Sequence, residues 1–318
     1  MSDHFDTDLE YLREWIGRTQ SETDEVTAGP VAALSATLDR DDPPPQRGDP
    51  LPPLWHWLYF LPRHRRSELG LDGHARLGVF FPPPSLPRRL YAGGRVELHR
   101  PLRVGDAVSR VSRIIDVQAK SGRTGALVFI RVRHEISNRE GLALTEDQDI
   151  VYRANPKLGD PAPAVQRASD EAAWTRDVHP DEVLLFRYSA LTFNGYRPHY
   201  DRRFALDVQG YPGLVVHGPL IATLLADLLR HSLPGASVSE FSFRAIRPLF
   251  DTSAFVVCGR PSDDGLTVKL WAREPDGALS VDATALLTAS SSQLPAKEPV
   301  KKSWWGRAGR WKLVAGSW

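Results

Sequence analysis

HGPLIATLLADL, at residues 217–228, and its weaker copy AGPVAALSATL, at residues 28–38, carry most of the information about the architecture of this chain. Each contains a Gly-Pro pair at its second and third residues, and the fixed φ of proline suits the first turn of a helix. Small and apolar residues follow on all sides, which predicts two long helices buried on most faces. A repeat of this length indicates two copies of one structural unit.

A similar set of predicted strands follows each helix. HRPLRVGD at residues 99–106 matches RAIRPLFD at residues 244–251. Alternating apolar and polar residues, bounded by turn signals, then predict three strands in each copy. These are residues 108–117, 125–136 and 143–152 in the first copy, and 255–259, 266–273 and 280–289 in the second. A long helix wrapped by an antiparallel sheet, present twice, predicts an α+β double hotdog.

The repeat also divides the chain. We expect an N-terminal hotdog at residues 1–154, a linker at 155–172 and a C-terminal hotdog at 173–292. The N-terminal unit carries a proline-rich insertion at residues 40–95, where prolines favour extended segments over regular elements. A basic, tryptophan-rich tail at 293–318 has no function that the sequence indicates.

Composition narrows the classes of partner. The chain has 318 residues, with 40 Lys and Arg against 39 Asp and Glu, so its net charge is +1. No overall field therefore favours nucleic acid or an anionic membrane, and neither is expected as a partner. Polar residues interrupt the longest apolar run and the N-terminus lacks an apolar core, so we expect a cytoplasmic protein.

Cofactor and metal motifs are absent from the sequence. Cys258 is the only cysteine, which excludes an intramolecular disulfide and a cysteine cluster and favours a buried, inert thiol. The chain contains neither an HExxH motif nor a glycine loop of the phosphate-binding kind. We therefore expect no metal and no bound cofactor.

The loop NGYRPHYD, at residues 194–201, carries the strongest chemical signal. His199 lies in a polar context, where an imidazole can exchange protons near neutral pH. Gly218 stands at a predicted helix start, where a backbone N–H has no partner within the helix and carries part of its positive dipole. Together they fit the addition or removal of water beside an acyl thioester: the histidine moves the proton and the helix start holds the charge on the thioester oxygen.

This arrangement resembles that of the MaoC-like (R)-specific enoyl-CoA hydratases. TFNGYRPHYD and VVHGPL carry the resemblance, which extends over most of residues 10–292 through LREWIGRT, VTAGPVAAL and HRPLRVGD. In two respects the chain differs: the family's aspartate falls on Thr192, and the gap between Asn194 and His199 is longer than usual. The variant resembles the branch that contains mitochondrial-type 3-hydroxyacyl-thioester dehydratases and the hydratases of 3-methylfumaryl-CoA (mesaconyl-CoA) and itaconyl-CoA.

The resemblance implies a set of site residues. His199 would act as the base, Asn194 would orient water or stabilise its own loop, and Gly218 would polarise the thioester carbonyl. Supporting residues would be Thr192, Tyr200, Asp201 and His217. A threonine hydroxyl is no strong base near neutral pH, so the site would depend on His199 or on another acid. For Asp201 the favoured role is that of a helix N-cap, and Tyr200 is as easily a packing residue.

The first copy looks catalytically degenerate. It has Ala28 where the second has His217, and the loop at residues 194–199 has no counterpart there. All the chemistry is therefore expected in the second copy, and replacing His56, His64 or His74 is expected to spare the chemical step. The proline-rich insertion would instead form a platform for the acyl and pantetheine parts of the substrate.

The resemblance further implies the substrate. The protein would hydrate a short branched dicarboxylic 2-enoyl-CoA, 3-methylfumaryl-CoA or itaconyl-CoA, to citramalyl-CoA. A distal carboxylate needs a cationic partner, and the candidates are Arg197, Arg88 and Arg89. Three basic clusters could bind the phosphates of coenzyme A, which would enter only as part of the substrate: residues 63–66, 88–89 and 202–203. A homodimer is possible.

Three alternatives stay open at this point. A 3-hydroxyacyl-thioester dehydratase of the fatty-acid-synthesis type would use the same chemistry on coenzyme A or acyl-carrier-protein substrates. A hotdog thioesterase would need a carboxylate that this loop lacks. A non-catalytic acyl-CoA-binding protein would explain the missing aspartate but not the retention of Asn194 and His199 in one copy.

Overall fold

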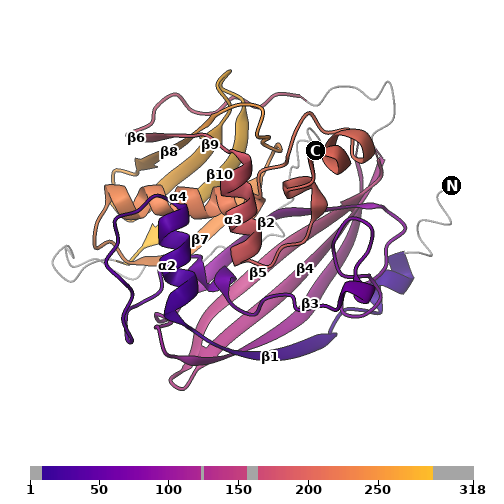
Figure 1. The fold of residues 1–318 in the computed structure, drawn as a ribbon, viewed down its shortest axis with the longest axis horizontal. Coiled ribbons are helices and arrows are strands. Elements are labelled where there is room, and N and C mark those ends of the chain that lie inside the picture. The colour runs from indigo at the N-terminus through magenta and orange to yellow at the C-terminus, as the bar shows by residue number, and fades with distance from the viewer. Residues whose placement is uncertain (1–8, 123–124, 156–163, 289–318) are drawn as a thin grey trace.

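Ten antiparallel strands in the described part of the chain form one continuous sheet. The computed structural model describes residues 9–122, 125–155 and 164–288, and the predicted tail at 293–318 lies outside them. The strand order is β1-β3-β4-β5-β2-β7-β10-β9-β8-β6 (Figure 1). The strands are β1 Thr19–Glu25, β2 Arg88–Leu98, β3 Ala107–Gly122, β4 Gly125–Asn138, β5 Gly141–Arg153, β6 Trp174–Val178, β7 Val238–Ala245, β8 Phe255–Pro261, β9 Thr267–Arg273 and β10 Leu279–Leu287.

The seam between β2 and β7 joins the two halves of the sheet. Gly93 in β2 lies opposite Arg244 in β7, and its φ of 146° belongs to the region that favours glycine. A Cβ at Gly93 would lie 2.3 Å from the carbonyl oxygen of Phe243, so only glycine allows the strands to approach there. All six strands expected after the two repeats are present. Regular structure resumes at Arg88, earlier than the predicted end of the proline-rich insertion at residue 95.

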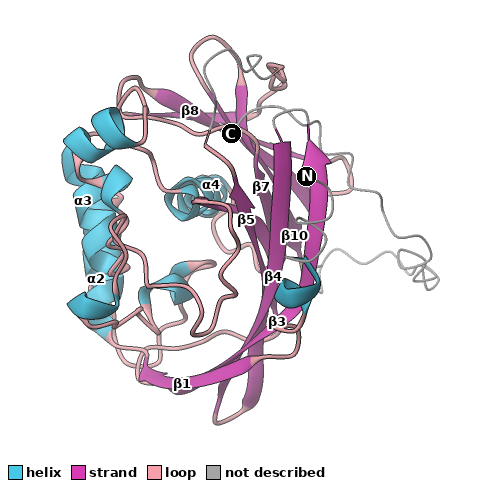
Figure 2. Cartoon of the chain, turned by 90° about the vertical axis from the view of Figure 1, so that its right-hand side faces the viewer, coloured by secondary structure: helices cyan, strands magenta, loops and turns pink. Residues whose placement is uncertain are grey.

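The three long helices lie on one face of the sheet. They are α2 Ala28–Thr37, α3 Glu182–Leu191 and α4 Gly218–Ser232, with short helical turns at η1 Trp55–Leu58, η2 Arg66–Glu68, η3 Arg197–His199 and η4 Phe204–Val208. Figure 2 shows α4 close to the sheet and α2 beside α3 in a layer further out. None of the described helices is long and apolar enough to cross a membrane.

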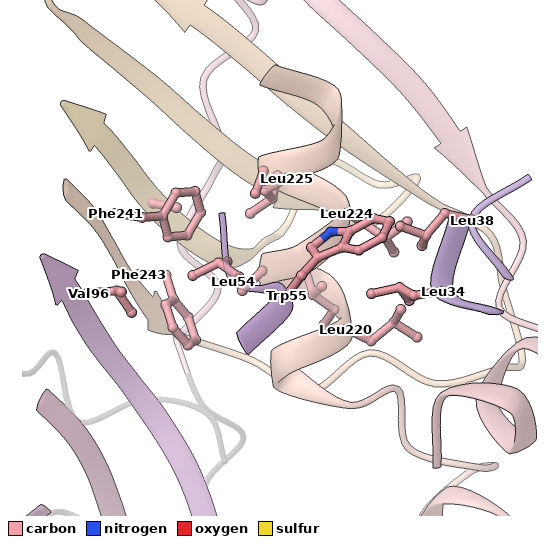
Figure 3. Close-up of a cluster of buried hydrophobic side chains, with 14 of the residues drawn as sticks. Leu34, Leu38, Leu54, Trp55, Val96, Leu220, Leu224, Leu225, Phe241 and Phe243 are labelled. Atoms are coloured by element: carbon pink, nitrogen blue, oxygen red, sulfur yellow. The ribbon is translucent and has the colours of Figure 1, made fainter. Parts of the chain in front are cut away.

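The two repeated helices differ in burial. Ten of the fifteen residues of α4 are buried, as predicted. The prediction for α2 is wrong, because only Leu34 and Ser35 of its ten residues are buried. Alanine, glycine and serine give α2 little apolar surface to bury. One side of α2 therefore packs against the core, and the rest of the helix stays on the surface. In Figure 3, Trp55 lies among Leu34, Leu220 and Leu224, between this edge and α4.

A buried ion-pair cluster fixes α4 to its neighbours. Asp227, with a side chain that is 1% exposed, accepts from Arg40 Nη1 at 2.6 Å and from Arg176 Nη1 at 2.7 Å. Arg40 follows α2 and Arg176 belongs to β6, so one carboxylate connects elements from both halves. This pairing explains how an aspartate is accommodated in an otherwise apolar helix.

Candidate active site

A cavity of about 1310 Å³ opens between the two halves of the chain. The second half contributes Asn194, His199 and Gly218 to its wall, together with Thr192, Tyr196 and Tyr200. The first half contributes residues from the proline-rich insertion and from β2, β3, β4 and β5. The polar loop and the helix start singled out in the sequence therefore face one space, and both halves enclose it.

His199 is held as a neutral proton acceptor. It ends η3 and is only 8% exposed. Its Nδ1 lies 2.7 Å from the carbonyl oxygen of Val215, and a carbonyl can only accept, so Nδ1 carries the hydrogen. Burial lowers the pKa of His199 to about 4, against the opposing effect of the Val215 carbonyl. At neutral pH Nε2 therefore offers a lone pair.

His217 supports the ring of His199. It is the N-cap residue of α4, is fully buried and stacks on His199 with ring centroids 3.6 Å apart. Its Nε2 lies 2.8 Å from the hydroxyl oxygen of Ser189. Burial, with a smaller contribution from His199, holds the pKa of His217 well below its usual value. This position fits the supporting role expected from the sequence.

Gly218 presents a helix start to the cavity. It is the first residue of α4, where a backbone N–H has no acceptor within the helix. The nearest atoms to an added Cβ would be the carbonyl oxygen and Cδ1 of Tyr91, at 3.9 and 4.0 Å. A side chain would thus meet no clash with the protein but would occupy space in front of the amide, which glycine leaves open to a ligand.

Asn194 and Thr192 are both engaged with backbone. Asn194 lines the cavity, and its Oδ1 accepts from the backbone N–H of Tyr196 at 3.0 Å, which is the loop-stabilising role considered beside the catalytic one. The Thr192 hydroxyl donates to the carbonyl oxygen of Tyr188 at 2.8 Å and closes the end of α3. Thr192, the position where the resemblance implied an aspartate, therefore has a hydroxyl whose hydrogen is already bonded.

Asp201 and Tyr200 take structural positions. Asp201 Oδ1 accepts from the Phe204 N–H at 3.0 Å, which is the predicted N-cap interaction, and Asp201 is not among the residues of the cavity wall. The Tyr200 hydroxyl donates to the carbonyl oxygen of Gly195 at 3.1 Å. Tyr200 lines the cavity but is 46% exposed, at its outer part.

The three candidate arginines differ in position. Arg197 is directed away from the cavity: it pairs with Asp201 at 2.7 Å and donates to the carbonyl oxygen of Leu71, and it is absent from the cavity wall. Because Asp201 already pairs with it, Arg197 is not placed to meet a ligand in this cavity. Arg88 lines the cavity but donates to Asn155 Oδ1 and to the carbonyl oxygen of Gln209.

Of the three candidate arginines, Arg89 is the one that remains available. It lines the cavity and lies over the ring of Phe81, 4.3 Å from the centroid. Within the described ranges it forms no ion pair. Arg202, from another predicted phosphate cluster, pairs with Glu182 and Asp251 away from the cavity.

An aspartate–histidine pair in the insertion was not predicted from the sequence. Asp72 Oδ2 lies 2.9 Å from His74 Nδ1, and Asp72 Oδ1 accepts from the backbone N–H of His74. His74 lines the same cavity as His199. From the sequence His74 was expected only to be dispensable for the chemical step; the Asp-x-His spacing within GLDGHARLG, at residues 70–78, was the available signal. The first half therefore places a second histidine at the site.

A buried carboxylate on the cavity wall was not predicted either. Glu146, which is 4% exposed, accepts from Trp57 Nε1 at 3.0 Å and from the Tyr91 hydroxyl at 3.2 Å, and its Oε2 lies 3.0 Å from His56 Nε2. Burial by itself would raise its pKa, but these donors and the nearby His134 hold it at about 2. An ionised carboxylate thus forms part of the first-half wall of the cavity.

Other sequence expectations concern cysteine and metals. Cys258 is buried, as predicted, and burial raises the pKa of its thiol. Among the residues that the structure describes, no group of three or more His, Cys, Asp or Glu side chains could hold a metal ion. A neutral imidazole and an open helix start on one cavity together suit proton transfer beside a polarised carbonyl.

Comparison with known proteins defines the class. Residues 54–251 match the family described as hydroxyacyl-thioester dehydratase type 2. The solved structure of HtdX from Mycobacterium tuberculosis superimposes with a TM-score of 0.60 at 19% identity, covering 84% of this chain and 99% of that one. Another M. tuberculosis protein, described as having a double hotdog fold, gives 0.52 at 15% identity, covering 86% and 96%. The α+β double hotdog is confirmed.

The chain belongs to the hydroxyacyl-thioester dehydratase type 2 family, within the MaoC-like hotdog proteins, and is a hydro-lyase. A relative named mesaconyl-C(4)-CoA hydratase, from Chloroflexus aurantiacus, is 47% identical over 274 residues, which cover 86% of this chain and 96% of that protein.

Proposed function

We propose that this protein adds water to a short 2-enoyl-CoA that carries a second carboxylate. The observation that carries the proposal is the position of His199 and Gly218 on one cavity, with a neutral imidazole nitrogen and a helix-start amide available to the same ligand. The 47% identity to a protein named mesaconyl-C(4)-CoA hydratase supports a substrate of this kind.

The chemistry assigns one task to each group. The Gly218 N–H polarises the thioester carbonyl, which makes the β-carbon electrophilic. His199 Nε2 accepts a proton from water as the oxygen bonds to the β-carbon, and the π electrons move to the thioester oxygen as an enolate. The same proton then returns from His199 to the α-carbon, and the carbonyl reforms. Because His199 is a weak base in this site, the imidazolium exists only transiently.

The cavity wall supports a polar acyl group. Arg89 is available for a carboxylate, and a carboxylate buried without a cation would be costly. A long-chain acyl group would need apolar side chains around it. The part of the wall formed by β2 to β5 instead includes polar side chains: Tyr91, Arg110, His134, Glu146 and Gln148. We infer 3-methylfumaryl-CoA as the first candidate and itaconyl-CoA as the second, each hydrated to citramalyl-CoA.

The mouth of the cavity suits the coenzyme A phosphates. Exposed basic residues of the insertion contribute to the wall: Arg63, His64, Arg66 and Arg76. In this proposal the insertion is the platform for the coenzyme A part of the substrate, and coenzyme A needs no other binding motif. A cytoplasmic location and a homodimer stay predictions of the sequence.

The alternative is a 3-hydroxyacyl-thioester dehydratase. The match to the type 2 dehydratase family over residues 54–251 favours it, and the same groups would serve the reverse reaction. Acyl-carrier-protein substrates belong to this alternative.

A panel of enoyl thioesters tests both functions. The purified protein is incubated with 3-methylfumaryl-CoA, itaconyl-CoA, crotonyl-CoA and crotonyl-acyl-carrier protein, and loss of the conjugated-thioester absorbance is followed. The proposal requires a higher kcat/KM for a dicarboxylic substrate than for crotonyl-CoA. Preference for crotonyl thioesters would establish the dehydratase alternative, and absence of turnover on all four would contradict both.

A further inference from the structure

The Asp72–His74 pair is the part of the cavity that the proposed mechanism does not use. Both side chains are partly exposed, His74 by 27% and Asp72 by 33%. His74 contributes to the cavity wall, and Asp72 precedes it by two residues in the insertion. A titratable side chain with a carboxylate partner therefore reaches the space where the substrate would lie.

The pair fixes which ring nitrogen of His74 is free. A carboxylate accepts hydrogen bonds, so the 2.9 Å contact with Asp72 Oδ2 places the hydrogen on Nδ1. His74 Nε2 has no hydrogen-bond partner among residues 9–122, 125–155 and 164–288. His74 thus presents the same state as His199: Nδ1–H bonded to an oxygen, and a lone pair on Nε2.

The insertion is docked firmly onto the loop that carries His199. The carbonyl oxygen of Asp72 accepts from the Arg197 N–H at 2.8 Å. Gly73 has a φ of 90°, and a Cβ there would lie 1.8 Å from the carbonyl oxygen of Gly195, so the two loops touch backbone to backbone. Glycine is needed at this contact for both its conformation and its size.

One aromatic ring connects the two histidines. His74 stacks on Tyr196 with centroids 4.3 Å apart, and Tyr196 meets His199 edge to face with centroids 5.2 Å apart. Charge on His74 also contributes to the lowered pKa of His199, which agrees with their proximity. The two rings are thus held by one shared neighbour on the same cavity.

The chemistry of water addition leaves a task for such a residue. A water between a base and an electrophilic carbon has two hydrogens, and its attacking lone pair is directed most closely when both are held. His199 can hold one hydrogen. Thr192 has committed its hydroxyl hydrogen to Tyr188, and Asp201 is engaged by Arg197 outside the cavity.

We propose that His74, oriented by Asp72, is a second catalytic residue that holds the attacking water. His199 Nε2 accepts the hydrogen that leaves, and His74 Nε2 accepts the hydrogen that stays on the oxygen and becomes that of the product hydroxyl. The O–H bond of the water that faces His199 breaks as the oxygen bonds to the β-carbon. The proton on His199 then returns to the α-carbon. Asp72 is a positioning residue. This inference rests on the proposed function, and for His74 it replaces the sequence-based expectation that all the chemistry lies in the second copy.

The test uses Asp72→Asn, His74→Ala and the control His99→Gln in the full-length chain. An asparagine of the same shape can donate to Nδ1, which moves the histidine hydrogen to Nε2 and turns the acceptor into a donor. We expect kcat with 3-methylfumaryl-CoA to fall on the order of 10²-fold in His74→Ala. In Asp72→Asn it should fall at least about tenfold, with little change in KM. The control His99→Gln should leave the rate unchanged, because His99 lies on the surface of the first half and outside the cavity wall.

Two readouts separate catalysis from folding. Thermal melting shows whether a variant is folded. The pH profile of kcat shows whether His74 Nε2 acts as the second acceptor, because protonation of His74 removes its lone pair. A kcat within about threefold of wild type in both His74→Ala and Asp72→Asn would overturn the inference, as would a loss confined to KM or to melting temperature. Absence of hydration by the wild-type protein would instead count against the proposed function.

Discussion

The imidazole rings of His199 and His217 lie face to face, with centroids 3.6 Å apart and planes inclined by 19°. Both residues are buried, and burial is the main cause that lowers the pKa of each. Two positive charges at this separation in an apolar setting would be strongly unfavourable. The pair is therefore uncharged at neutral pH, and His217 holds the plane of His199 while leaving its Nε2 directed to the cavity.

Replacing His199 by alanine should abolish hydration and leave the fold intact. The side chain supplies the proton acceptor, and we expect a loss of at least about 10²-fold in kcat. Turnover is measured by the absorbance of the conjugated thioester, and far-ultraviolet circular dichroism checks the fold. Near-wild-type turnover would remove His199 from the mechanism.

Activity should fall in acid because protonation of His199 consumes its lone pair. With a pKa of about 4, His199 stays neutral through the neutral range, so kcat should be level from about pH 6 to 8 and decline on approaching pH 4. A pH–rate profile in buffers of constant ionic strength measures this. A decline centred above pH 6 in both kcat and kcat/KM would contradict the assignment.

Stability should depend on pH in the same direction. The folded pKa values of His199 and His217 lie below the unfolded value, so between about pH 6.5 and 4 the unfolded chain binds more protons. The free energy of unfolding should therefore be level above about pH 7 and decrease as pH falls below 6.5. Urea melts at pH 7.5 and 5 test the sign, and a smaller decrease is expected in His217→Gln.

Gly218→Ala should separate ligand approach from folding. The added Cβ would meet Tyr91 only at ordinary contact distance, so melting temperature should change little. The methyl group would stand before the helix-start amide, and we expect kcat/KM to fall about tenfold to 10³-fold, as when an oxyanion donor is lost. Unchanged kcat/KM would show that the thioester binds elsewhere.

Arg89→Met should change the choice of substrate. If Arg89 meets the distal carboxylate, kcat/KM should fall at least about tenfold for 3-methylfumaryl-CoA and little for crotonyl-CoA, which lacks that group. Arg197→Met is the matched control, since Arg197 pairs with Asp201 outside the cavity wall. An equal loss on both substrates in Arg89→Met would assign Arg89 to coenzyme A binding instead.

Asp227→Ala should destabilise the protein without altering the cavity. It would leave Arg40 and Arg176 without their shared carboxylate in a mostly buried position. The expected cost is about 2–3 kcal/mol, below that of a fully buried pair because both arginines are partly exposed. Asp282→Ala, at an exposed position of β10, should stay within about 0.5 kcal/mol of wild type in the same urea melts.

The sequence was informative where the determining interactions are local. Helix α4, the strands β3–β5 and β8–β10, and the N-cap at Asp201 follow from periodicity, turn residues and a three-residue capping contact. The His199 loop and the Gly218 helix start were recognisable together because they are close in the chain. For α2, the small residues that suggested burial in fact provide too little apolar area to require it.

Only the tertiary structure decided which distant groups meet at the site. His74 and Tyr196 are far apart in the chain, and their contact depends on Gly73 passing against Gly195. Arg197 looked available in sequence but pairs with Asp201, four residues further along the chain. Contacts of this kind arise from loop docking and from competition between charged partners, and neither leaves a periodic signal along the chain. The sequence by itself determined the two repeated helices, six of the ten described strands, and the segments that carry His199 and Gly218. The packing of the insertion onto the catalytic loop decided the composition of the cavity.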